Sequence, residues 1–283
     1  MKNYSELNVL VTGADGFIGK NLKSSLKENN IIHTLGEIIF TLDNWEEYVW
    51  DFLYERRPEV VFHVGACSNT LEQRVNYMMT VNFEFTKVLT DWCKGTNTPL
   101  IYSSSAASYG IDGRYPSNLY GWSKYAAECY VVANGGIALR YFNVYGPGEE
   151  FKGNMASVAY QAYKTNKQNG IVKLFPGNPA RDFVYVDDVI NANIFAWENY
   201  GEIKGEKYDV GSGKAEAFEY IMELLDIPFS YYDESVIPKG YQKYTCSDES
   251  KWMPTWQPKF SLKQGIEKYK LYLDENLSSK SSS

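Results

Sequence analysis

The sequence predicts an α/β fold in which helices cover both faces of a parallel, doubly wound sheet. Short apolar runs alternate with longer stretches of helical periodicity through the first half of the 283-residue chain. The first apolar run also ends at a glycine turn that opens a helix, which is the strand–turn–helix unit of such sheets. At this length we expect one large domain with a smaller appended region.

The expected elements follow in an order that suits parallel strands joined by crossover helices. Apolar, strand-like stretches lie at 8–12, 31–35, 38–42, 59–64, 100–104 and 137–142. Helical periodicity covers 17–26, 45–56, 77–94 and 117–133. Later in the chain the sequence predicts a loop at 146–154, helices at 155–167, 187–199 and 262–273, and a short extended stretch at 172–176. The sheet should therefore be mostly built by residue 143.

Composition narrows the classes of partner and of chemistry. A formal net charge of -7, with no run of lysine or arginine, argues against a nucleic-acid surface or a polybasic membrane patch. The four cysteines lack CxxC spacing and no apolar run is long enough to span a bilayer, so we expect a reduced, cytoplasmic protein without a structural metal. His33 and His63 are the only histidines, which argues against a histidine-based triad. His63 ends an apolar run and is expected to pack in the core.

A glycine-rich turn after the first predicted strand predicts a dinucleotide site. Gly13, Gly16 and Gly19 form a GxxGxxG pattern, a relative of the dinucleotide-binding fingerprint, between a strand and a helix. Glycines let the backbone approach a pyrophosphate, and the helix start at Phe17 and Ile18 offers unpaired amides and a partial positive charge. We therefore expect these five residues to contact NAD or NADP.

The second strand-like stretch should carry the partner of the adenine ribose. In NAD sites that partner is usually a carboxylate about 20 residues further on, and Glu37 lies in roughly that place. Glu37 is equally consistent with a surface charge, and no arginine nearby marks a 2′-phosphate, so NAD and NADP both stay open. We expect a Rossmann-like NAD(P)-binding domain over 1–148, to which 171–211 partly returns, a smaller substrate-binding region over 149–275, and a polar tail over 276–283.

Tyr120 and Lys124 form a YxxxK pattern that predicts a proton acceptor. Residues four apart on a helix lie on one face, so the ammonium of Lys124 can favour the phenolate of Tyr120. A free phenol titrates near pH ~10. To act as a base near neutrality, the phenol of Tyr120 therefore needs a cation and a hydrogen-bond donor beside it. Ser105, directly after the predicted strand at 100–104, can supply the donor. Together with the glycine loop, this pattern indicates nicotinamide redox chemistry.

Taken in order, these motifs resemble the extended short-chain dehydrogenase/reductase family, in particular its nucleotide-sugar epimerases and dehydratases. The likeness spans nearly the whole chain. It implies that Ser105, Tyr120 and Lys124 form the catalytic group, with Tyr120 removing a hydroxyl proton as hydride leaves the sugar carbon for nicotinamide. It also implies further cofactor contacts from Ala66, Asn82, Tyr141 and Asn143, beside Tyr120 and Lys124.

Longer stretches are similar to the ADP-glycero-manno-heptose 6-epimerases of that family. They are GACSNT from Gly65, NYMMTVNFEF from Asn76, RYFNVYGP from Arg140, KGNMASVA from Lys152 and KLFPGNPARDFVYVDDV from Lys173. Inversion by oxidation and re-reduction requires the planar ketone to present its other face to the nicotinamide, so a second acid/base group is useful. The resemblance assigns that role to Lys152; the alternative is a loop lysine that binds a diphosphate or is merely solvated.

The resemblance also implies how a nucleotide diphosphate would be held. The expected substrate contacts are Ser105, Asn143, Lys152, Arg181 and Tyr241. A guanidinium fork matches phosphate oxygens well. A structural ion pair of Arg181 with Asp182 or Asp187 is the alternative.

Three other activities are compatible with parts of this pattern. A sugar-nucleotide 4,6-dehydratase would carry an acidic pair just after the catalytic serine, where this chain has Ala106 and Ala107. A UDP-galactose-type 4-epimerase would need no second base, and Lys152 would then bind phosphate alone. The third alternative is a catalytically silent dinucleotide sensor, against which the intact Ser105, Tyr120 and Lys124 weigh.

The chain departs from the typical family member in two shortened loops. They lie between Tyr109 and Tyr120 and between Val132 and Ile137. We expect both near the edge of the substrate pocket, where trimming would alter the sugar accepted or the assembly. The resemblance itself implies a homo-oligomeric enzyme of surface-polysaccharide precursor synthesis, such as lipopolysaccharide.

Overall fold

A computed structural model describes residues 6–28, 30–111, 113–168, 170–237 and 241–277. The chain divides into two compact units. The first unit consists of Met1–Tyr141, Ile190–Asp209 and Lys251–Trp256, and the second of Phe142–Val189, Val210–Ser250 and Gln257–Ser283. Most of the polar tail predicted at 276–283 lies outside the described residues.

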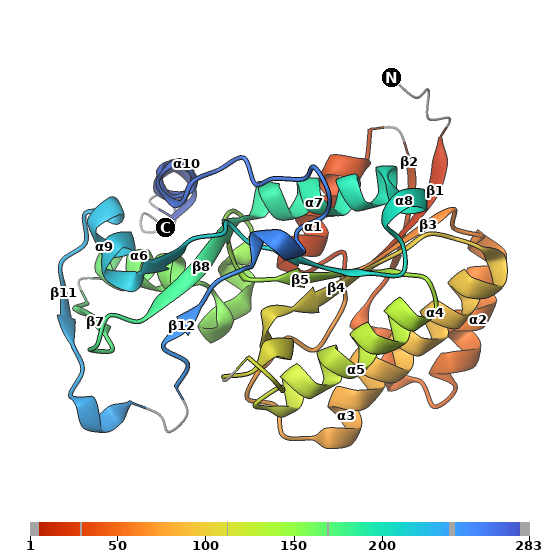
Figure 1. The fold of residues 1–283 in the computed structure, drawn as a ribbon, viewed down its shortest axis with the longest axis horizontal. Helices are drawn as coiled ribbons and strands as arrows, with labels where there is room; N and C mark the ends of the chain where they lie inside the picture. The colour runs from red at the N-terminus through yellow and green to blue at the C-terminus, as the bar shows by residue number, and fades with distance from the viewer. Residues whose placement is uncertain (1–5, 29, 112, 169, 238–240, 278–283) are drawn as a thin grey trace. The chain divides into compact units, whose positions relative to one another are not determined.

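The first unit is built on a six-stranded sheet with the strand order β2-β1-β3-β4-β5-β9 (Figure 1). The strands are β1 (Leu7–Thr12), β2 (Asn30–Leu35), β3 (Val60–His63), β4 (Leu100–Ser105), β5 (Ile137–Tyr141) and β9 (Lys207–Val210). The pairings from β2 through β5 are parallel. Strands β3 and β4 are almost entirely buried, which is why they appear in the sequence as continuous apolar runs rather than as alternating ones.

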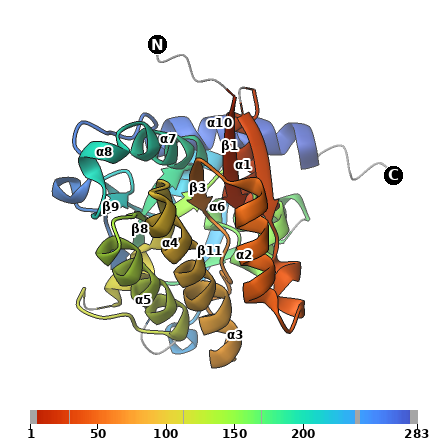
Figure 2. The same cartoon turned by 90° about the vertical axis from the view of Figure 1, so that its right-hand side faces the viewer.

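Helices cover both faces of this sheet. On one face α2 (Trp45–Arg56), α4 (Phe85–Thr96) and α5 (Leu119–Ala133) lie side by side (Figure 2). They bury Leu53, Leu89 and Ala127 against Leu10 and Tyr102 of the sheet. The other face carries α1 (Phe17–Leu26) and α7 (Val186–Glu198), and there Phe62 of β3 meets Trp197 edge-on, with ring centroids 6.1 Å apart (Figure 1). The predicted doubly wound α/β fold is confirmed.

The shorter helical elements of the first unit refine the predicted boundaries. They are η1 (Glu37–Thr41), α3 (Val75–Met79), the π-helical turn η2 (Thr80–Glu84), η3 (Ala106–Tyr109) and α8 (Tyr200–Ile203). A further turn, η6 (Glu249–Lys251), begins in the second unit and ends in the first. The strand-like prediction at 38–42 is wrong, because η1 occupies this stretch. Its apolar residues do not share one buried sheet face: Ile39 is buried, whereas Ile38 is 78% exposed. The helix predicted at 77–94 is present as the succession α3, η2 and α4.

The second unit is organised around β8 (Ala180–Tyr185). β8 pairs in parallel with β6 (Asn143–Tyr145) and β12 (Tyr244–Thr245), and antiparallel with β10 (Ala215–Ala217). β7 (Val172–Leu174) pairs separately with β11 (Phe229–Tyr231). The helical elements are η4 (Glu149–Met155), α6 (Val158–Lys167), α9 (Phe218–Leu225), η5 (Glu234–Val236) and α10 (Leu262–Leu277). None of the described helices has the length and apolar character needed to cross a membrane.

The core of the second unit is rich in aromatic side chains. Tyr145 and Tyr269 are almost fully buried in it, beside Ile266 of α10. A β-carbon on Gly265 would lie 2.0 Å from the hydroxyl oxygen of Tyr145, so glycine is required for α10 to pack this closely. α6 begins at Val158 rather than at residue 155 because Ser157 caps it, its hydroxyl accepting the N–H of Tyr160.

Candidate active site

The glycine loop forms a cradle in which side chains would collide with the backbone. Gly13 follows β1 with φ of +63°, and a β-carbon on it would lie 2.5 Å from the Cα atom of Gly65. A β-carbon on Gly19 would lie 2.0 Å from the carbonyl oxygen of Gly13. Gly16 caps α1 without a side-chain hydrogen bond, and the first turn of α1 carries no acidic residue. The loop therefore fits a pyrophosphate held by the backbone amides at the start of α1.

His63 holds the strand ends that form this cradle. Its Nδ1 lies 2.7 Å from Thr12 Oγ1, and its Nε2 lies 2.8 Å from Thr86 Oγ1. Thr12 Oγ1 also accepts the N–H of Gly65 at 2.9 Å. Burial, with the charge of Lys124, holds the pKa of His63 well below its ordinary value, so the ring is neutral. The core role predicted for His63 is confirmed.

Glu37 lies directly beyond the end of β2, in the first turn of η1. It is exposed, and its carboxylate accepts a hydrogen bond from the hydroxyl of Tyr77. That bond, with burial, raises the pKa of Tyr77 above its ordinary value. The structure thus places a carboxylate at the carboxyl end of the second strand, where a ribose hydroxyl could be bound.

Asn82, a predicted cofactor residue, lies in the π-helical turn and is hydrogen-bonded to the loop after β3. Asn82 accepts the N–H of Cys67 at 2.8 Å and donates to the carbonyl oxygen of Cys67 at 3.1 Å, which fixes the loop that contains Ala66. Asn82 also donates to Ser123 Oγ at 2.9 Å, and Ser123 donates to the carbonyl oxygen of Tyr120 at 2.7 Å. Sequence reasoning missed Ser123, although it lies inside the YxxxK motif. The amide of Asn82 thus links the loop after β3 to α5.

The structure brings Ser105 and Tyr120 together. Ser105 ends β4, and its hydroxyl accepts the N–H of Ala107 at 3.2 Å as η3 begins. Tyr120 lies in the first turn of α5, which Asn118 caps by accepting the N–H of Gly121 at 2.8 Å. The Ser105 hydroxyl lies close enough to the Tyr120 phenol to lower its pKa by hydrogen bonding. The proximity predicted for these two side chains is confirmed.

The electrostatics of Tyr120 differ from the prediction. Burial raises the pKa of the Tyr120 phenol, the Ser105 hydrogen bond lowers it, and Cys67 adds a smaller increase. Lys124 is 3% exposed, with Nζ 4.3 Å from the ring centroid of Tyr102. Burial lowers the pKa of Lys124 to about 7, against the opposing charge of Glu128. Burial thus acts beside the two predicted influences of Lys124 and Ser105, because it disfavours the charged forms of both Tyr120 and Lys124.

A buried ion pair beneath the catalytic group was also missed. Arg140 of β5 donates through Nε to Glu128 Oε2 at 2.8 Å and through Nη2 to Oε1 at 2.5 Å. Ser104 donates to Glu128 Oε2 at 2.7 Å. Because Glu128 lies one helical turn after Lys124, the pair ties the catalytic face of α5 to β4 and β5. The available signal was a carboxylate four residues after Lys124 on a helix with an apolar face.

Tyr141, at the end of β5, is buried and internally hydrogen-bonded. Its hydroxyl bonds Ser103 Oγ at 2.8 Å and the side chain of Asn193. Burial raises its pKa to about 12. A direct contact of Tyr141 with the cofactor stays a prediction.

In the second unit the structure brings Arg181 and Tyr241 together. The Arg181 guanidinium lies 5.4 Å from the ring centroid of Tyr241, and it donates to the carbonyl oxygens of Ala180 and Gln242. Burial lowers the pKa of Arg181, and Tyr241 opposes that change. Asn143, at the start of β6, is exposed.

The two carboxylates considered as ion-pair partners of Arg181 bind other groups instead. Asp182 is buried and accepts hydrogen bonds from Ser212, Gly213 and Ser247. Asp187 pairs with Lys268 at 3.0 Å. The guanidinium of Arg181 is thus held by carbonyl oxygens and an aromatic ring rather than by these carboxylates.

Lys152 lies within η4 and is half-buried. Burial lowers the pKa of its ammonium, and Glu149 raises it. The same loop contains Gly153, whose φ of +54° breaks the helical turn after Lys152. A lowered pKa is what a proton-transferring lysine needs near neutrality.

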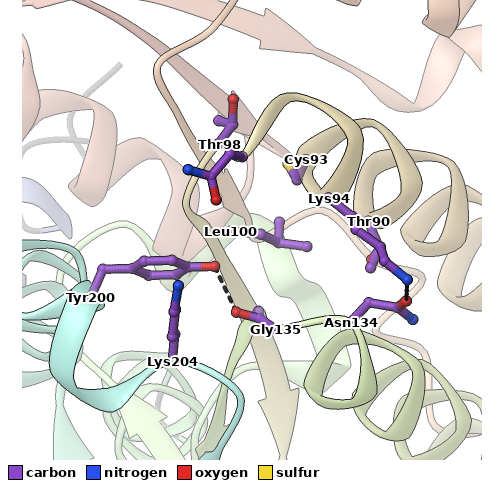
Figure 3. A pocket seen from close by; sticks show the side chains of 11 residues that line it. Thr90, Cys93, Lys94, Thr98, Leu100, Asn134, Gly135, Tyr200 and Lys204 are labelled. Carbon is purple, nitrogen blue, oxygen red and sulfur yellow. Dashed lines mark hydrogen bonds between the residues drawn. The ribbon is translucent and has the colours of Figure 1, made fainter.

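The first unit contains a cavity of about 120 Å³ (Figure 3). It lies at the edge of the sheet where β4 and β5 begin. It is lined by the end of α4, the start of β4, the turn before β5, and α8. Lys94 donates to Asn134 at 2.9 Å and Tyr200 donates to the carbonyl oxygen of Gly135 at 2.8 Å (Figure 3). The shortened 132–137 loop, predicted near the edge of the substrate pocket, lies at the amino end of β5, whereas Ser105 lies at the carboxyl end of β4. The loop precedes β5, whereas the cradle follows β1, so parallel strands place them at opposite edges.

Comparison with known proteins identifies the family of this chain. Residues 9–211 match the NAD dependent epimerase/dehydratase family. The chain is 32% identical over 315 residues to ADP-L-glycero-D-manno-heptose-6-epimerase of Brachyspira hyodysenteriae, covering 95% of this chain and 98% of the relative.

Solved structures give the same result. ADP-L-glycero-D-manno-heptose-6-epimerase of Helicobacter pylori matches with a TM-score of 0.82 and 26% identity, covering 95% of this chain and 96% of that one. UDP-glucose 4-epimerase of Thermotoga maritima, solved with UDP-glucose, matches with a TM-score of 0.80 and 26% identity, covering 95% and 99%. On the family match and the likeness over nearly its whole length, the chain belongs to the NAD dependent epimerase/dehydratase family.

Proposed function

We propose that the protein is a nucleotide-sugar epimerase acting on ADP-glycero-manno-heptose, which it inverts at carbon 6 by transient oxidation and re-reduction. The observation that carries this proposal is the closeness of the Ser105 hydroxyl to the Tyr120 phenol, whose pKa it lowers, in the same unit as the glycine cradle. The 32% identity to the Brachyspira enzyme supports the choice of sugar.

In the proposed first half-reaction, Tyr120 accepts the proton of a sugar hydroxyl while Ser105 donates a hydrogen bond to the same oxygen. When bound, the dinucleotide supplies the hydride acceptor and, in its oxidised form, a positive charge. Burial disfavours the phenolate of Tyr120, so this additional cation is what the residue needs to act near neutrality. Lys124, with a pKa of about 7, contributes charge or a neutral amine according to the pH.

In the proposed second half-reaction, Lys152 donates the proton that restores the alcohol on the inverted carbon. The lysine belongs to the KGNMASVA stretch, and its lowered pKa supports proton transfer. Arg181, beside Tyr241, would hold the diphosphate, and Asn143 would bind nearby. These roles rest on the motif positions and on the environments of the side chains.

We propose NAD rather than NADP as the cofactor. Gly13, Gly16, Phe17, Ile18 and Gly19 would hold its pyrophosphate. The carboxylate of Glu37 suits a ribose hydroxyl and repels a 2′-phosphate. The cytoplasmic location, the homo-oligomeric assembly and a role in surface-polysaccharide synthesis stay predictions.

A 4-epimerase is the second candidate, favoured by the match to the Thermotoga UDP-glucose 4-epimerase. Lys152 would then bind phosphate only. A dehydratase lacks support, because Ala106 and Ala107 open η3 where an acidic pair would be needed. A silent sensor would show no turnover on ADP-, UDP-, GDP- or CDP-sugars with the dinucleotide bound.

The deciding experiment incubates the purified protein and NAD with ADP-glycero-manno-heptose of one configuration and follows the product stereochemistry by NMR. Inversion by the wild type is expected, and Lys152→Met should abolish it while oxidation to the ketone persists. Lys164→Met, an exposed lysine of α6, is the matched control and should behave as wild type. Full inversion by Lys152→Met would refute the two-base scheme. Inversion of UDP-glucose but not of the heptose would support the 4-epimerase instead.

A further inference from the structure

A carboxylate in the loop that carries Lys152 is fully buried. Glu149 begins η4, and its side chain is 0% exposed. Its Oε1 accepts the N–H of Gly146 at 3.2 Å and the hydroxyl of Ser157 at 2.7 Å. Its Oε2 accepts the N–H of Ser157 at 2.5 Å. One carboxylate therefore joins the two ends of the loop 146–157, and Lys152 lies between them.

The partners of Glu149 favour its ionised form. The carboxylate is the acceptor in each of the three hydrogen bonds. A protonated carboxyl group accepts hydrogen bonds less well, so these donors favour the ionised form. Burial raises the pKa of Glu149, while the bonds from Ser157 and Gly146 and the charge of Lys152 lower it. A buried carboxylate with these donors is thus a negative charge held at a fixed place.

Lys152 is the cationic neighbour of Glu149. Tyr145 of β6, Tyr160 of α6 and Tyr269 of α10 face it, and the pKa of each is raised, so they are neutral phenols near pH ~7. Glu150 is the neighbouring acid on the same loop. Lys152 experiences the field of Glu149 directly, since Glu149 raises the pKa of its ammonium against the effect of burial.

We propose that Glu149 is a positioning residue for Lys152, holding the loop in the shape that presents the amine and supplying the negative charge that keeps it protonated. This inference rests on the proposed role of Lys152 as the second acid/base group. In re-reduction the ketone carbon accepts a hydride with its electron pair, and the carbonyl oxygen takes a proton from the Lys152 ammonium. The N–H bond breaks, an O–H bond forms, and a neutral amine remains. A lysine that is already deprotonated cannot complete this step.

The test compares two half-reactions as a function of pH. Oxidation, which depends on Tyr120, is followed by the absorbance of reduced nicotinamide, and inversion is followed by NMR. In Glu149→Gln the alkaline limb of inversion should move about one pH unit lower, because the negative charge that raises the pKa of Lys152 is removed. Oxidation should be unchanged. Glu150→Gln, which removes the same charge one residue along, should keep the wild-type profile.

Glu149→Asp separates charge from shape. It retains the negative charge but reaches less far, so the limb should stay at its wild-type pH while the inversion rate falls. An unchanged limb in Glu149→Gln, or an equal shift in Glu149→Asp, overturns the proposal. Loss of both half-reactions in both variants assigns Glu149 to folding alone and also overturns it. Persistent inversion by Lys152→Met would instead refute the proposed function, so the two failures are distinguishable.

Discussion

Gly121 and Ala107 lie so close that a β-carbon on Gly121 would be 2.7 Å from the carbonyl oxygen of Ala107. This contact seats the first turn of α5 against η3. Tyr120 precedes Gly121 on that turn and Ser105 precedes η3, so the close approach brings the Ser105 hydroxyl near the Tyr120 phenol. The catalytic geometry thus depends on the absence of a side chain at one position.

Replacing Gly121 with alanine should separate α5 from η3. Because the β-carbon meets backbone rather than a flexible side chain, the helix must shift, and we expect oxidation to fall by at least about tenfold. Stopped-flow measurement of the oxidation half-reaction checks this. Gly95→Ala is the control: Gly95 lies in α4 with open space around its Cα, and that change should be neutral or slightly stabilising.

Removing the Ser105 hydroxyl should move the pH dependence of oxidation upward. The hydrogen bond from Ser105 lowers the pKa of Tyr120, so in Ser105→Ala the phenol titrates at higher pH. The acidic limb of the rate profile should shift in the same direction, with a loss of about 10²-fold at neutral pH. A rate profile with an unmoved acidic limb would contradict the assignment of Tyr120 as the base.

Lys124 should destabilise the fold near neutrality. Its folded pKa is about 7 and its ordinary value is 10.5, so the unfolded chain binds more protons between these values. Its unfavourable contribution is therefore largest below pH ~7 and disappears as the pH approaches its ordinary value. We expect Lys124→Met to raise the free energy of unfolding by roughly 2–4 kcal/mol at pH ~7, and less at pH ~9.5.

Urea unfolding at the two pH values measures this difference. Lys87→Met serves as the control, since Lys87 lies exposed on α4 in a surface pair with Glu84 and should change stability little at either pH. An equal effect of Lys124→Met at both pH values would show that the lysine is charged in the folded protein.

Neutralising Glu37 should weaken discrimination between the two dinucleotides. Glu37→Gln keeps an oxygen that can accept the Tyr77 hydroxyl but removes the negative charge. NAD affinity should fall about three- to tenfold and NADP affinity should rise, as measured by calorimetric titration. Glu46→Gln, an exposed position in α2, should leave both affinities unchanged.

Much of the first unit follows from local patterns in the sequence. The apolar runs at β3 and β4 and the glycines that bracket the start of α1 each depend on residues close together in the chain. The YxxxK spacing depends on a single helix, and the structure confirms that Ser105 meets Tyr120. The 38–42 stretch was mistaken for a strand because a short apolar run does not distinguish a strand from a 3-10 turn.

By itself, the sequence determined the doubly wound fold, the glycine loop and the order of the catalytic motifs. Each of these depends on the spacing and periodicity of residues that lie close together in the chain. Only the tertiary structure decided the electrostatics and the loop positions. Burial, which raises the pKa of Tyr120 and lowers that of Lys124, arises from elements far apart in the chain. The edge of the sheet that the 132–137 loop occupies, and the buried carboxylate of Glu149 beside Lys152, likewise depend on packing that no local pattern specifies.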